Sequence, residues 1–179
     1  MAAALVTRLP TVDQVLNDYA TAIGDDFAGY RNHVYRIVNL CVEIVGRGEL
    51  ETIAVAAVFH DLGIWTEGTF DYIAPSIALA HDYIATHGHQ DWTVEVEAMI
   101  ANHHKITSST AEPRSLIEGF RRADWIDVTR GLRSFGVSRS FVARLFATWP
   151  SAGFHWRLVT LTLDRARSHP LTPLPMVRL

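Results

Sequence analysis

Cysteine is almost absent from the sequence: the single Cys41 has no partner for an internal disulfide, so a reducing compartment is the simplest expectation. Long hydrophobic runs are absent too, and no stretch reaches the roughly 18 apolar residues of a membrane-spanning helix. Basic residues are not in excess, and a net charge of −3 provides no general attraction to nucleic acid or to an anionic membrane. The first residues lack the basic segment and the apolar core of a signal peptide. We therefore expect a cytoplasmic protein that binds neither nucleic acid nor a membrane.

What the sequence does contain is a succession of amphipathic helical patterns, with few alternating, strand-like runs. Its 179 residues, with 49% hydrophobic and 20% charged side chains, are typical of one globular domain with its own core. The expected helices span residues 11–22, 26–46, 50–62, 75–87, 91–104, 114–130, 138–148 and 154–167. We predict an all-α fold, a compact bundle of about seven or eight helices, as a single domain over residues 1–179. Residues 131–179 would hold the last helices and a proline-rich tail.

The most informative feature is the pair His60-Asp61, which closes the apolar stretch 50–62. An imidazole and a carboxylate placed together in apolar surroundings are costly unless something pairs them, and a divalent cation would do so. Adjacent helical residues point about 100° apart, so they converge on one ion most easily at a helix end. Gly63 is a natural place for this helix to stop. We interpret His60 and Asp61 as the catalytic centre of a metal site.

Further histidine and aspartate residues interrupt otherwise apolar helix faces at other places in the chain. They are His33, His81, His103 and Asp124, each with apolar neighbours three, four or seven residues away. A single inward-facing histidine is usually a satisfied core residue. The same interruption on separate helices favours a shared ligand, because buried polar groups need partners.

The ligand types restrict the metal. Imidazole and carboxylate without thiolate suit Fe, Mn, Zn, Co or Ni and argue against a structural zinc site of the cysteine type. The predicted metal ligands are His33, His60, Asp61, His81, His103 and Asp124. The first three together with Asp124 would hold one ion, and His81 and His103 would hold a second ion, with Asp61 bridging the two. We expect one or two divalent ions, with iron slightly favoured if two are bound.

A second set of residues is predicted to contact the substrate or to support the metal ligands: Tyr30, His104, Lys105, Arg121 and Asp127. His103 lies on a more apolar face than His104, so we assign His103 to the metal. Lys105 would hold a phosphate oxygen, or it is a solvated lysine at a helix end. Asp127 would orient a ligand histidine, or it pairs with Arg130 at the surface. His155 is interpreted as lying outside the site.

His33, the pair His60-Asp61 and Asp124, in this order on successive helices, resemble the HD-domain superfamily of metal-dependent phosphohydrolases. The resemblance covers about residues 28–130. It implies a compact HD-type helical bundle and a reaction in which a metal-activated water attacks a phosphate ester. The substrate would be a small molecule that carries a phosphate group.

The additional histidines, His81 and the pair His103-His104, are similar to those of the superfamily members that carry two metals. These members include cyclic-dinucleotide phosphodiesterases and di-iron oxygenases that act on phosphonates or inositol. Residues 105–107 read Lys-Ile-Thr where the cyclic-di-GMP phosphodiesterases have Gly-Tyr-Pro, and Ile64 stands where the phosphonate-cleaving oxygenases have a histidine. Both differences argue against those particular substrates.

The function predicted from the sequence is therefore hydrolysis of phosphate mono- or diesters, either nucleotide-like compounds or small phosphorylated metabolites. Three alternatives remain. The first is a di-iron oxygenase on the same scaffold, which would use the same six ligands. The others are a hydratase of a small C–N compound with one zinc ion, and a catalytically silent domain in which metal supports the fold.

Overall fold

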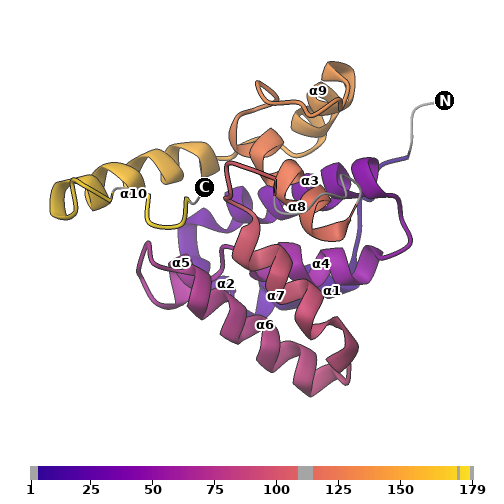
Figure 1. The fold of residues 1–179 in the computed structure, drawn as a ribbon, viewed down its shortest axis with the longest axis horizontal. Coiled ribbons are helices and arrows are strands. Elements are labelled where there is room, and N and C mark those ends of the chain that lie inside the picture. The colour runs from indigo at the N-terminus through magenta and orange to yellow at the C-terminus, as the bar shows by residue number, and fades with distance from the viewer. Residues whose placement is uncertain (1–3, 109–114, 173, 178–179) are drawn as a thin grey trace.

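The computed structural model describes residues 4–108, 115–172 and 174–177, and this part of the chain folds into helices without β-strands (Figure 1). The longer helices are α1 (Pro10–Asp18), α3 (Phe27–Val45), α4 (Leu50–Phe59), α6 (Ile73–His87), α7 (Thr93–Asn102), α8 (Leu116–Val128), α9 (Arg139–Thr148) and α10 (Phe154–Ser168). The short ones are α2 (Ala20–Ile23), α5 (Gly63–Thr66) and the 3₁₀ turns η1 (Gly24–Asp26) and η2 (Gln90–Trp92). The prediction of an all-α bundle with seven or eight main helices is confirmed.

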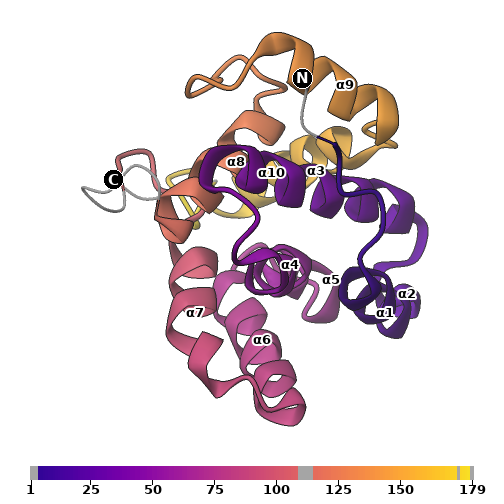
Figure 2. The same cartoon turned by 90° about the vertical axis from the view of Figure 1, so that its right-hand side faces the viewer.

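The centre of the bundle is α3, which packs most extensively against α8 and then against α4. The α6–α7 pair lies on one side of this centre and α9 on the other (Figure 2). Residues 52–59 of α4 are all buried, which explains why this segment is apolar all round rather than on one face. Tyr30 and His33 of α3 are also completely buried, so polar groups on α3 and at the end of α4 face a protein interior.

The end of α4 differs from the sequence prediction. The helix stops at Phe59, residues 60–62 form a turn, and Gly63 begins α5 instead of ending the preceding helix. The amide of Leu62 donates to the carbonyl of Phe59, three residues back, which tightens the chain at this point. His60 and Asp61 therefore lie in a turn, where their side chains can converge.

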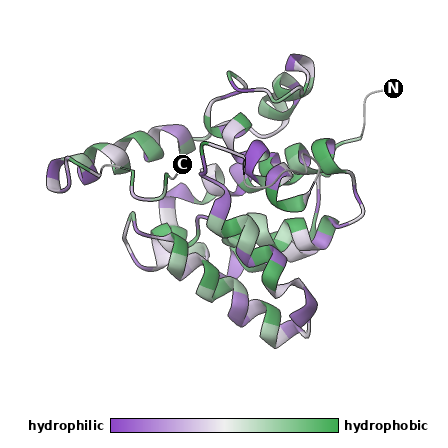
Figure 3. Cartoon of the chain, in the orientation of Figure 1, coloured by the Kyte–Doolittle hydropathy of each residue, from purple (hydrophilic) through white to green (hydrophobic). Residues whose placement is uncertain are grey.

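The last helix, α10, extends away from the bundle, and the C-terminal segment returns beside it (Figure 1). Hydrophilic and hydrophobic residues alternate along α10, so this helix is not apolar throughout (Figure 3). Met176 is buried in a small apolar cluster with Ile64, Phe70 and Tyr72, so the tail packs on the segment that follows α5. Among the described residues, no helix has the length and apolar character that crossing a membrane requires.

Candidate metal centre

Four parts of the bundle bring histidine and aspartate side chains to one buried place. They are α3 with His33, the turn after α4 with His60 and Asp61, the turn after α7 with His103 and His104, and α8 with Asp124. All of these side chains are buried except that of His104, which is 16% exposed. All the predicted metal ligands except His81 are therefore brought together.

The first ligand group consists of His33, His60 and Asp61. The Nε2 atoms of His33 and His60 are 3.0 Å apart. Asp61 Oδ2 lies 3.3 Å from Nε2 of His60 and 3.6 Å from Nε2 of His33. Asp124 Oδ1 lies 3.9 and 4.0 Å from the same two nitrogens. Two nitrogens and two carboxylate oxygens thus surround one small volume.

Hydrogen bonds on the far side of each ring determine which nitrogen faces this volume. Nδ1 of His33 donates to Asp127 Oδ2 at 2.6 Å, and Nδ1 of His60 donates to the carbonyl of Ala57 at 2.7 Å. Nδ1 of His103 donates in the same way to the carbonyl of Ile100 at 2.6 Å. Each Nε2 is then left with a lone pair that points inward, which is how metal-ligating histidines are commonly oriented.

The two inward lone pairs of neutral His33 and His60 cannot satisfy each other, because both nitrogens are then acceptors. A proton or a metal ion between them would satisfy both. Burial by itself lowers the pKa of His33, but the hydrogen bonds and negative charges of Asp127 and Asp61 outweigh it and raise the pKa to about 9. The same surroundings that favour a proton here also favour a metal ion.

The second ligand group consists of Asp61, His103 and His104, so Asp61 belongs to both groups. Its Oδ2 faces His33 and His60, whereas its Oδ1 lies 3.4 Å from Nε2 of His103. A carboxylate that directs one oxygen to each of two neighbouring sites is in the position that a bridging ligand needs.

Several polar atoms of the cluster have no hydrogen-bond partner within the described residues. They are Asp61 Oδ1, His103 Nε2 and both carboxylate oxygens of Asp124, although Asp124 Oδ2 lies 3.1 Å from Nδ1 of His104. Unpaired buried polar atoms are rare, and several in one place call for a ligand. The buried histidine and aspartate groups could hold a metal ion.

Both carboxylates are held in their charged form. Burial tends to raise the pKa of Asp61, but the neighbouring His60 and further hydrogen bonds from histidines hold it well below its usual range. Burial likewise opposes ionisation of Asp124, and the charge of His104 lowers its pKa. The cluster therefore presents negative charge to a cation.

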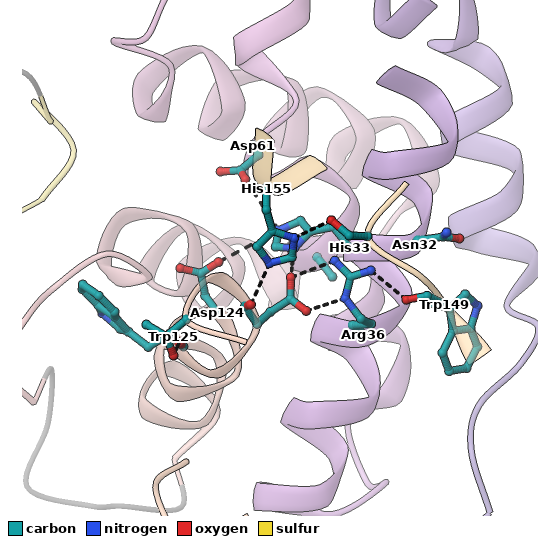
Figure 4. A network of polar contacts seen from close by, with 12 residues as sticks. Asn32, His33, Arg36, Asp61, Asp124, Trp125, Trp149 and His155 are labelled. Atoms are coloured by element: carbon teal, nitrogen blue, oxygen red, sulfur yellow. Dashed lines mark hydrogen bonds and ion pairs between the residues drawn. The ribbon is translucent and has the colours of Figure 1, made fainter. Parts of the chain in front are cut away.

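Asp127 orients His33 and is itself held by Arg36, which is completely buried on α3 (Figure 4). Nε of Arg36 donates to Asp127 Oδ1, and Nη2 donates to Oδ2 at 3.0 Å. Nη1 of Arg36 donates to the carbonyls of Trp149 and Pro150 at 2.9 and 3.2 Å. Asp127 is therefore buried and orients His33, a candidate ligand, and it does not form the surface pair with Arg130 that was the alternative.

His104 lies between Asp124 and Tyr72. Its Nδ1 is 3.1 Å from Asp124 Oδ2, and its Nε2 is 2.6 Å from the hydroxyl of Tyr72. The pKa of Tyr72 is raised well above its usual value by burial and then by the negative charge of Asp61, so its hydroxyl remains a donor to His104. His104 both belongs to the second ligand group and pairs with Asp124.

His81 does not reach the cluster, and here the predicted ligand set needs correction. Its Nε2 lies 3.1 Å from Glu97 Oε2 between α6 and α7, and its side chain is 37% exposed. The buried residues of α6 are Ser76, Ala80 and Ile84, at intervals of four. His81 follows this buried stripe by one position and so points about 100° away from it. The second group contains His104 in its place.

The remaining predicted residues surround the cluster. The hydroxyl of Tyr30 donates to the carbonyl of Val58 at 2.9 Å, and its ring packs on Trp65. Arg121 is paired with Glu118 at 2.6 Å and donates to the carbonyl of Lys105 at 2.9 Å. Tyr30 and Arg121 therefore support the walls of the site, and the interaction found for Lys105 is through its backbone.

Sequence reasoning missed the contribution of α10. The ring of Phe154 stacks on His33 with centroids 4.0 Å apart. Nε2 of His155, which lies near His33 in Figure 4, donates to the carbonyl of Asp127 at 2.9 Å. Nδ1 of His155 accepts from the hydroxyl of Ser151 at 2.7 Å. The alternation of aromatic and polar residues at 154–156 resembles ordinary packing, so only the fold reveals these contacts.

A pocket of about 480 Å³ opens directly beside the cluster, with His104 and Asp124 in its wall. This is the size range of small-molecule sites. The other walls come from α8, α10, the segment after α5 and the C-terminal tail. His104 and Asp124 are therefore the members of the cluster that border this space.

Comparisons of the chain with models of known families, with curated proteins and with solved structures found no match. The chemistry that the site can perform therefore follows from its own residues: imidazole and carboxylate ligands, negative charge, and an adjoining pocket.

Gly63 packs closely against the backbone of Tyr72, whose side chain borders the site. A Cβ atom at this position would lie 2.6 Å from the carbonyl oxygen of Tyr72 and 3.0 Å from Ser76 Oγ. We expect Gly63→Ala to lower the free energy of unfolding by about 1–3 kcal/mol through overpacking. Urea denaturation measures this loss. Gly48→Ala is the matched control, because a Cβ there meets nothing within 4 Å. Equal stability of the two variants would contradict the tight approach of Tyr72.

Proposed function

We propose that this protein is a metal-dependent hydrolase of phosphate mono- or diesters, of the HD-domain type. The observation that carries the proposal is the position of Asp61, whose two carboxylate oxygens face two adjacent groups of histidines. Pairs of neighbouring divalent ions are the usual arrangement for in-line displacement at phosphorus. The order of the clustered residues along the chain also fits the HD pattern.

The residues fit two ions. His33, His60 and Asp61, with Asp124 close by, would hold the first, and Asp61, His103 and His104 would hold the second. Iron, manganese, zinc, cobalt and nickel accept this mixture of imidazole and carboxylate. When bound, such ions lower the pKa of a coordinated water and stabilise the negative charge that develops on the phosphoryl group.

The protein's own residues prepare the site for this chemistry. Asp127 keeps the proton of His33 on Nδ1, which leaves Nε2 free to act as a ligand. Asp61 and Asp124 supply the negative charge that retains cations. His104 is the partly exposed member of the cluster and borders the pocket, so a substrate in the pocket would meet the second ligand group on this side.

Metal removal and re-addition test the proposal. We expect chelator-treated protein to release no p-nitrophenol from p-nitrophenyl phosphate or bis-p-nitrophenyl phosphate. One of the five metals should restore turnover, and elemental analysis should then find one or two ions per chain. Metal binding should also raise the melting temperature, because an ion at 100 times its Kd contributes about 2.7 kcal/mol to stability.

A pair of histidine variants controls this experiment. His103→Ala removes a side chain whose Nε2 faces Asp61, whereas His81→Ala removes one that faces Glu97. We expect the first to lower metal content and the second to leave it unchanged. Metal uptake without turnover of any phosphate ester would overturn the proposal in favour of a silent metal-binding domain or a C–N hydratase. Oxygen consumption by an iron-loaded form would favour a di-iron oxygenase.

A further inference from the structure

The pocket beside the metal centre is markedly uneven in character. One part of its wall is formed by His104 and Asp124 of the cluster. The other walls are mainly apolar side chains of α8, α10, the segment after α5 and the tail: Phe70, Trp125, Leu158, Val159, Leu163 and Met176. Val159 and Leu163 in this wall are 45% and 52% exposed.

Three arginines of α8 and α10, the helices that contribute to the wall, are paired with carboxylates. Arg121 pairs with Glu118 at 2.6 Å, and Arg157 pairs with Asp26 at 3.0 Å. Arg165 pairs with Asp71 at 2.7 Å. Among the described residues, the one arginine in the pocket wall is Arg130, whose guanidinium lies 5.7 Å from the ring of Phe146.

A polyphosphate or a nucleotide needs several cationic or polar groups along its length, because each phosphate carries charge that must be neutralised. Outside the cluster, the polar side chains in the described wall are Arg130, Tyr72, His155 and Thr162, and the other lining residues are apolar. An apolar organic group, in contrast, would be desolvated favourably against these walls. The pocket therefore favours small phosphorylated compounds with an apolar group over nucleotide-like esters.

We infer that the substrate is a phosphate ester with an apolar alkyl or aryl group, which lies between α10, α8 and the tail while the phosphoryl group lies at the end of the pocket lined by Asp124 and His104. The inference rests on the proposed function for the identity of the reacting group, and on the pocket for the organic group. Its volume of about 480 Å³ accommodates a chain of several carbons but not a second protein segment of any length.

Binding of n-alkylphosphonates to the metal-loaded protein tests the organic group without requiring turnover, because these compounds lack the P–O–C bond of an ester. In isothermal titration calorimetry, the affinity should rise about two- to fourfold with each methylene from ethyl to hexyl. In parallel, hydrolysis of hexyl phosphate should exceed that of glycerol 3-phosphate and of ATP by at least about tenfold in kcat/KM, since only the alkyl ester buries apolar surface.

The matched variants exchange exposed apolar residues for asparagine without adding charge. Val159→Asn with Leu163→Asn alters the pocket wall, whereas Val94→Asn with Leu132→Asn alters equally apolar residues that are 81% and 92% exposed and lie outside it. We expect the first pair to weaken hexylphosphonate binding at least tenfold and to leave ethylphosphonate binding unchanged. The second pair should change neither affinity.

The outcomes separate the two proposals. Chain-length-dependent binding without hydrolysis of any ester would support the apolar pocket and overturn the phosphohydrolase. Hydrolysis with no preference for the alkyl chain would support the phosphohydrolase and overturn the apolar pocket. If Val159→Asn with Leu163→Asn changed the oligomeric state in size-exclusion chromatography and not the hexylphosphonate affinity, the apolar face would be an interface between copies and the inference would be wrong.

Discussion

Asp61→Asn should abolish the binding of both ions and reduce phosphate-ester hydrolysis by about three orders of magnitude or more. Asp61 is shared by the two ligand groups, so the change weakens both at once. The metal contribution to transition-state stabilisation is several kcal/mol, and each 1.36 kcal/mol corresponds to a factor of ten in rate. Elemental analysis of the purified variant and its kcat/KM with p-nitrophenyl phosphate measure the two effects.

The control for this variant is Asp91→Asn, the same change at an exposed position in η2. It should retain full metal content and activity. Circular dichroism should show that Asp61→Asn keeps its helices, so that loss of metal is not a result of unfolding. Full metal content and full turnover in Asp61→Asn would remove the basis for assigning the site.

Arg36→Met should lower the free energy of unfolding by about 3–5 kcal/mol, because it leaves the buried carboxylate of Asp127 without its cationic partner. This is a large part of the 5–15 kcal/mol that typically separates folded from unfolded states. The two backbone carbonyls after α9 that accept from Arg36 would lose their donor as well. Urea denaturation followed by circular dichroism measures the loss.

Arg31→Met is the control on the same helix. Arg31 pairs with Asp13 at 2.9 Å, but both side chains are about one-third exposed, so the loss should be about 0–1 kcal/mol. Adding Asp127→Leu to Arg36→Met should recover part of the stability and weaken metal binding about 10–100-fold, because His33 loses the acceptor for Nδ1. Equal losses in Arg36→Met and Arg31→Met would mean that the buried ion pair does not stabilise the fold.

Most of the clustered ligands could be predicted from the sequence because each interrupts an apolar helix face. His33, His103 and Asp124 have buried apolar neighbours at intervals of three, four or seven residues, and that spacing indicates which way a side chain points. The pair His60-Asp61 was identified by its apolar surroundings, although α4 ends at Phe59 rather than after the pair.

His81 shows where such reasoning fails. On a helix with apolar residues on more than one side, the sequence alone does not tell which side is buried, and one position of error turns a side chain by about 100°. The partnerships of His104 with Tyr72 and of Asp127 with Arg36 join residues 32 and 91 positions apart. No local pattern indicates them. The predicted cytoplasmic location and single domain over residues 1–179 stay predictions.

The sequence by itself determined the helical class and the kinds of atoms that a ligand would meet, because helical periodicity and residue chemistry are local properties of short segments. The tertiary structure decided which histidines share an ion site and that Asp61 faces both groups. It also decided that α10 and the tail form an apolar wall beside them. These features depend on the rotation of each helix against its neighbours, and that rotation is set by side-chain packing across the whole core.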